Sequence, residues 1–172
     1  MDPKAFEKVF LKLTLHRMTD MYFAKLKACL QGLPHEALWT ESYPGGNTTG
    51  GIVLHMSEHI ARSRLRLSGM ESELQQGFEQ YFPNESLTSE QVIELFEEQL
   101  NRWSGIMARY IQGELPLEAE QVHQLYHLVE HAGYHLGQVI DRVQGATGKK
   151  AEFFNKGLNE AYLRQQIEAD IR

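Results

Sequence analysis

The chain contains a single cysteine, Cys29, among its 172 residues, and only 5 prolines. One cysteine cannot form an intrachain disulfide, which fits a reducing compartment, and the opening residues MDPKAFEK lack the apolar core of a secretory signal. We therefore expect a cytosolic protein. No stretch approaches the roughly 18 consecutive apolar residues that cross a bilayer, so a membrane protein is not expected.

Basic runs are missing as well. The formal net charge is −6, and no run of cationic residues exceeds the pair Lys149 and Lys150. Nucleic acid is therefore not an expected partner, because a phosphate backbone is bound through clustered cations. A hydrophobic content of 42% argues against a disordered chain, and the length suits one domain over residues 1–172 with a substantial core.

Sustained alternation of apolar and polar residues is also absent, whereas apolar residues recur at spacings of three and four. Asn47 to Thr49 offer helix caps, and Thr88 with Gln91 forms a capping box. The pattern predicts an all-α fold, most simply a four-helix bundle. We expect helices over residues 3–29, 50–67, 88–110 and 118–144, with a further helical segment at 159–169 on the outside.

The apolar residues of 31–47 show no helical or strand periodicity, and the stretch contains two prolines and three glycines. It is therefore predicted to be a loop between the first and second helices. Loops of this length often carry binding groups. Trp39 and Tyr43 could cover the open end of the bundle and shape a substrate pocket, or they could seal the core.

Four histidines recur at intervals of four, at positions 123, 127, 131 and 135. Each step of four residues turns an ideal helix by about 400°, so neighbouring histidines differ by roughly 40° in direction. Only His131 and His135 are predicted to face the bundle interior, and His123 and His127 are predicted to face water.

Two imidazoles at i and i+4 can reach one divalent ion. A firm site needs a third ligand from another helix, for which the candidates are His16, His55 and His59. The second helix is the natural donor, because it carries its own HxxxH pair at 55 and 59.

The segments HMSEH and HLVEH also match the H-x-x-E-H signature of inverted zinc proteases. Their glutamates, Glu58 and Glu130, lie well over 90° from the middle of the apolar arcs of their helices. Since the glutamate of that signature must face the ion, we do not favour a peptidase.

The segments HAGYHLGQVIDRV at 131–143 and NTTGGIVLHMSEHIAR at 47–62 resemble the DinB/YfiT-like family of metal-binding helical bundles. The similarity covers essentially the whole chain. It implies an up-down-down-up four-helix bundle in which His55, His131 and His135 bind one divalent metal ion. The helical wheel slightly favours His59 over His55; we follow the family pattern and keep His59 as a residue behind the ligands or a fourth ligand.

Family members with known activities are thiol-dependent transferases and isomerases that use bacillithiol, mycothiol or glutathione. The resemblance therefore implies a small-molecule substrate and a low-molecular-weight thiol. It also implies a homodimer, in which Gly133 and Gly137 would allow close helix approach. Local packing within one subunit explains the same two glycines.

Three neutral imidazoles leave a coordination position open, as in catalytic zinc sites, where bound water or thiol ionises near neutral pH. We expect a metal-dependent thiol transferase or hydrolase, with zinc or nickel foremost, although imidazole also suits copper and iron. The alternatives are a non-catalytic dimeric bundle with a structural or regulatory metal, and an all-α interaction module without metal.

Overall fold

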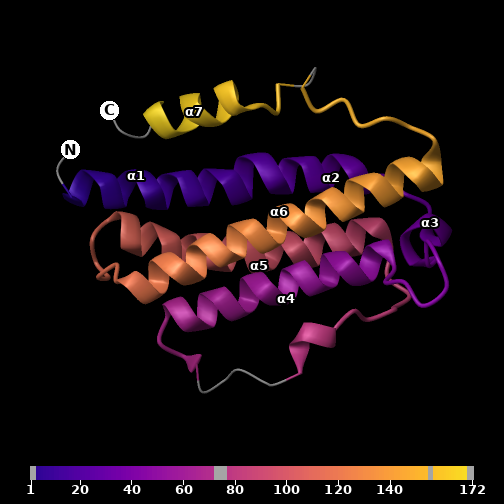
Figure 1. The fold of residues 1–172 in the computed structure, drawn as a ribbon, viewed down its shortest axis with the longest axis horizontal. Helices are drawn as coiled ribbons and strands as arrows, with labels where there is room; N and C mark the ends of the chain where they lie inside the picture. Colours follow the sequence, from indigo (N-terminus) through magenta and orange to yellow (C-terminus); the bar gives the residue numbers. More distant parts are fainter. Residues whose placement is uncertain (1–2, 72–76, 155–156, 170–172) are drawn as a thin grey trace.

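The computed structural model describes residues 3–71, 77–154 and 157–169, which form helices without any strand. Long helices lie side by side (Figure 1): α1 (Pro3–His16) and α2 (Ala24–Leu30) belong to one rod, and α4 (Thr49–Leu67), α5 (Ser89–Ile111) and α6 (Ala119–Thr147) lie next to it. In this view the α1–α2 rod runs from left to right, α4 and α5 run back, and α6 returns. The prediction of an all-α fold is confirmed.

The predicted helix starts are present. The Thr48 hydroxyl accepts a hydrogen bond from Gly51 N at 3.0 Å, and Thr88 and Gln91 form the reciprocal capping box that begins α5. Helix α6 ends later than the predicted residue 144: it runs to Thr147 and is capped by Gly148, whose φ of 68° favours glycine.

The first rod differs from the regular α-helix that was predicted. Its middle, η1 (Arg17–Phe23), is π-helical and leads directly into α2. The buried positions Met21 and Leu26 are five residues apart, one more than an α-helical turn allows on one face. Leu26 belongs to the core cluster, whereas Met21 is buried beside Lys25 and Phe153, so both side chains are buried although they do not share one cluster.

The connection at 31–47 contains a short helix, α3 (His35–Trp39), where no regular structure was predicted. A single turn is too short to produce a recognisable period. Trp39 is buried in the core, and its indole N–H donates to Leu87 O at 2.7 Å, whereas Tyr43 is 60% exposed. Of the two aromatics, Trp39 is the one that seals the core.

Helix α4 packs against both α5 and α6. Towards α5, Ser63 accepts a hydrogen bond from the fully buried Trp103 indole. Towards α6, the buried His55 ring contacts the rings of His131 and His135. This packing brings the histidine face of α4 against the histidine face of α6.

The predicted outer segment is present as α7 (Glu160–Ala169), which lies along α1 (Figure 1). Arg17 and Glu160 form a bidentate ion pair that joins the π-helical segment to α7. None of the helices in the described ranges is long and apolar enough to span a membrane.

Gly133 packs against Tyr22 of the same chain. A Cβ atom at this position would lie 2.8 Å from the Tyr22 hydroxyl oxygen, so the glycine allows Tyr22 to approach α6. At Gly137 a Cβ would meet nothing within 4 Å. Local packing therefore explains Gly133.

Two glycine substitutions should have opposite effects on stability. In Gly50→Ala the new Cβ would lie 2.5 Å from the Trp39 ring, and overpacking of this kind costs about 1–3 kcal/mol. Gly105→Ala, on the exposed face of α5 with nothing within 4 Å, should stabilise the protein by up to about 1 kcal/mol. Urea unfolding measures both, and equal stabilisation by the two variants would contradict the close packing at Gly50.

Candidate metal centre

Three imidazoles meet between α4 and α6. His55 is 2% exposed and His135 is 7% exposed, while His131 is partly buried between them. Nε2 of His131 lies 3.3 Å from Nε2 of His55 and 3.2 Å from Nε2 of His135. One ring nitrogen from each of the three lies within 4.8 Å of the others, so these residues can hold a metal ion.

Hydrogen bonds on the far side of two rings determine which nitrogen faces inward. The Nδ1–H of His55 donates to Tyr81 O at 3.1 Å, and that of His135 donates to Gln138 Oε1 at 2.8 Å. The amide of Gln138 is itself oriented, because its Nε2 donates to the Tyr134 hydroxyl at 3.0 Å. Each bond leaves an Nε2 lone pair directed into the centre.

The donor geometry fits a metal ion. Zinc–nitrogen bonds of about 2.0–2.1 Å at tetrahedral angles separate ligand nitrogens by roughly 3.3 Å. The contacts of His131 with His55 and His135 have this length. A proton on His131 Nε2 can be donated to only one of its two neighbours, whereas a cation accepts all three lone pairs.

Burial keeps these imidazoles uncharged. Burial, and next the neighbouring His135, lowers the pKa of His131 to about 3. Burial and then His131 lower the pKa of His59 to about 2. Burial is also the main cause of the lowered pKa values of His55 and His135. Neutral imidazole is the form that binds metal, so the folded chain holds the rings in that form.

Residues 78–82, which precede α5, cover the centre. Phe82 stacks on the His55 ring with centroids 4.1 Å apart, and Phe78 lies at 6.3 Å in a nearly parallel orientation. Phe78 begins the short 3-10 helix η3 (Phe78–Gln80), directly before Tyr81. A Cβ at Gly51 would lie 2.9 Å from Pro83 O, so glycine allows this segment to approach α4.

From the sequence, no role was assigned to Phe78, Tyr81 or Phe82. No local pattern marks them, because they act on residues of other elements. Gln138 was also missed as a functional residue, although its position three residues after His135 on one helix face was a usable signal.

The remaining candidates lie outside the converging set. His59 packs its ring against His131, with centroids 3.6 Å apart, but it is not among the three whose nitrogens gather. His123 and His127 are exposed, as predicted. His16 contacts Asp20 at 2.6 Å on the first rod.

The two protease-like segments do not assemble a site. Glu58 pairs with Arg62 at 3.7 Å and is 38% exposed, and Glu130 is exposed. Neither carboxylate belongs to the group that can hold an ion. The geometry therefore agrees with the rejection of a peptidase.

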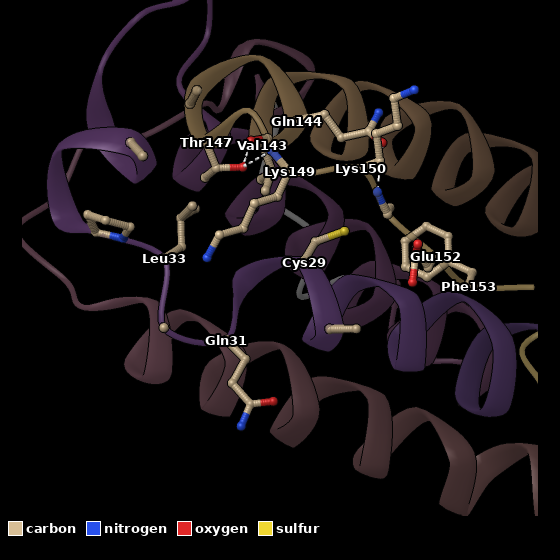
Figure 2. A pocket seen from close by; sticks show the side chains of 16 residues that line it. Cys29, Gln31, Leu33, Val143, Gln144, Thr147, Lys149, Lys150, Glu152 and Phe153 are labelled. Atoms are coloured by element: carbon tan, nitrogen blue, oxygen red, sulfur yellow. Dashed lines mark hydrogen bonds between the residues drawn. The ribbon is translucent and has the colours of Figure 1, made fainter. Parts of the chain in front are cut away.

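A cavity of about 560 Å³ lies elsewhere, between α2, α3 and the C-terminal end of α6. The Cys29 thiol and the Lys149 side chain lie in its middle, with Leu33 and Phe153 on opposite sides (Figure 2). None of the three converging histidines lines it. The cavity is thus separate from the histidine centre.

The fold and the site together define a class: an all-helical protein with three close histidines that can hold a metal ion. No protein-family model, curated protein or solved structure matches the chain.

Removing the Gln138 acceptor should weaken metal binding. Gln138→Leu leaves the Nδ1–H of His135 without its partner, and loss of such a supporting bond typically costs about 10–100-fold in metal affinity. Gln138→Glu keeps an acceptor and should stay near the wild type. Competition between protein and a chromophoric zinc chelator measures both, and equal affinity of the leucine variant would show that the bond does not orient His135.

The metal-free protein should lose stability as the pH falls from about 6.5 towards 3. In this window the unfolded chain binds protons on histidines whose pKa values in the folded chain are about 3 for His131 and about 2 for His59. His59→Gln removes one such group and should flatten the pH dependence of the free energy of unfolding. The exposed His123→Gln is the control, and identical slopes for both variants would contradict the assignment.

Proposed function

We propose that His55, His131 and His135 bind one divalent transition-metal ion, and that the protein is a metal-dependent transferase or hydrolase acting on a small molecule. The observation that carries the proposal is the convergence of three Nε2 atoms, two of which are held as lone-pair donors by the Nδ1 hydrogen bonds of His55 and His135. Zinc and nickel are the foremost candidates, since both accept imidazole readily.

The residues of the chain have distinct parts in this function. His55 and His135 are fixed ligands, because Tyr81 O and the Gln138 amide hold their rings. The aromatic rings of Phe78 and Phe82 keep bulk water away, which strengthens electrostatic interactions at the site. When bound, an ion with three neutral ligands and an open position lowers the pKa of a coordinated water or thiol.

The substrate pair in this proposal is a small electrophile and a low-molecular-weight thiol, as the resemblance to the DinB/YfiT-like bundles implies. The order of helix directions, with α4 and α5 running opposite to α1 and α6, supports that resemblance. So does the placement of one ligand on α4 and two on α6. The homodimer implied by the same resemblance belongs to this proposal as well.

A second candidate function has its own support. His55 and His135 are almost completely buried, and aromatic rings lie over them, so an ion bound there would have little contact with solvent or substrate. In this alternative the ion ties α6 to α4 and to Tyr81, and the bundle carries no reaction at this centre.

Elemental analysis of untagged protein purified without chelator tests the binding proposal. We expect about one metal ion per chain in the wild type and in His123→Ala, and a loss of most of the metal in His55→Ala, because a two-ligand site is weak. The absence of metal from the wild type after incubation with zinc or nickel would reject the proposal.

Thiol consumption then separates the two candidate functions. Loaded protein is mixed with glutathione or bacillithiol and a small electrophile, and free thiol is followed over time. Turnover that disappears in His55→Ala supports the transferase. No turnover, combined with a large drop in melting temperature on chelation, supports the structural role.

A further inference from the structure

The inner ligands lie behind apolar side chains. Phe82 lies over His55, Phe82 and Tyr134 lie against His135 at centroid distances of 6.1 and 5.0 Å, and Phe78 lies 6.3 Å from His55 and 4.7 Å from His59. A hydrated cation gains no lone pair from phenylalanine rings to replace the waters that it sheds. Uptake therefore requires a side of the centre that offers other donors.

Such donors lie in a contiguous row from the surface. His127 is exposed, and its ring centroid lies 5.9 Å from that of His131 and 6.3 Å from that of His59. His59 and His131 are partly buried and in contact with each other. From His131 the row reaches His135 at 4.4 Å, and exposure falls at each step inward.

We propose that His127 and His59 form, together with His131, an outer capture site for a divalent transition-metal ion, through which the inner centre is loaded. The proposal rests on the function proposed above. His127 and His131 are four residues apart on α6, a spacing at which two imidazoles can reach one ion. Because His131 belongs to both ligand sets, the ion keeps a protein ligand throughout the transfer.

His131 has the freedom that this role needs. It is the one ring of the inner three whose Nδ1 lacks a hydrogen-bond partner among the described residues, although that atom is buried. His55 and His135 are each tied by such a bond. Turning the His131 ring between outer and inner positions exchanges only its Nε2 contacts within the centre and breaks no Nδ1 hydrogen bond, whereas His55 and His135 would each lose one.

The outer residues are suited to brief occupation. In the described part of the chain the only group with gathered ligand nitrogens is the inner one, so the outer set is not arranged to hold an ion firmly. A transient binding site must bind the ion weakly enough to release it to the inner site. The loose geometry of the outer set meets that condition.

Stopped-flow uptake of Co²⁺, followed by its visible absorption, tests the proposal with untagged, metal-free protein. In His127→Ala we expect association to slow by about tenfold, the lower part of the range over which association rates vary among variants of one site. Release into excess EDTA should slow by the same factor, because uptake and release share one path. The equilibrium affinity for Co²⁺ should stay unchanged.

His123→Ala is the matched control, since His123 is exposed on the same helix one turn away, and no ring contact joins it to another histidine in the ranges the structure describes. It should load at the wild-type rate. His59→Phe keeps an aromatic ring against His131 but removes the nitrogens, and it should also slow uptake.

Several outcomes would overturn the proposal. One is uptake by His127→Ala at the wild-type rate. Another is a loss of affinity in that variant, which would make His127 a ligand of the final site. If the wild type binds no Co²⁺ at equilibrium, the function proposed above fails; if it binds Co²⁺ and the His127 variant loads normally, only the capture site fails.

Discussion

The centre depends on two hydrogen bonds that fix the proton on the outer nitrogen of an imidazole. Tyr81 O and the Gln138 amide oxygen each accept from an Nδ1–H, and each thereby leaves an Nε2 lone pair pointing inward. Two such lone pairs on either side of His131 repel one another unless a proton or a cation lies between them. A proton on His131 can be donated to only one of them, whereas a cation accepts both, so the arrangement suits an ion better than a proton.

Enclosure of the centre follows from residues 78–82, which precede α5. They supply the Tyr81 carbonyl and two phenylalanine rings, so one stretch of chain both orients a ligand and removes water from it. The same burial lowers the histidine pKa values and keeps the rings neutral. The cavity at Cys29 lies elsewhere, so the centre can be approached only past these aromatic side chains or from the side of His59 and His127.

The long helices were predictable because their signals are local. Thr88 and Gln91 satisfy backbone groups within three residues of each other, and the apolar period of α5 needs no partner to be recognised. The π-helical turn at 17–23 and the short helix α3 were not predicted. The π-helical turn contains Met21, which is buried beside Phe153, a residue distant in the sequence. Helix α3 is a single turn, and its Trp39 packs on Gly50 and donates a hydrogen bond to Leu87 O.

By itself the sequence determined that His131 and His135 share a helix face, because a spacing of four residues has that consequence in any α-helix. It did not decide between His55 and His59, and the helical wheel slightly favoured the latter. The tertiary structure brings His55 to the pair and leaves His59 beside it, since the packing of α4 on α6 and the Tyr81 carbonyl set the ring direction. Contacts between distant segments leave no trace in local spacing.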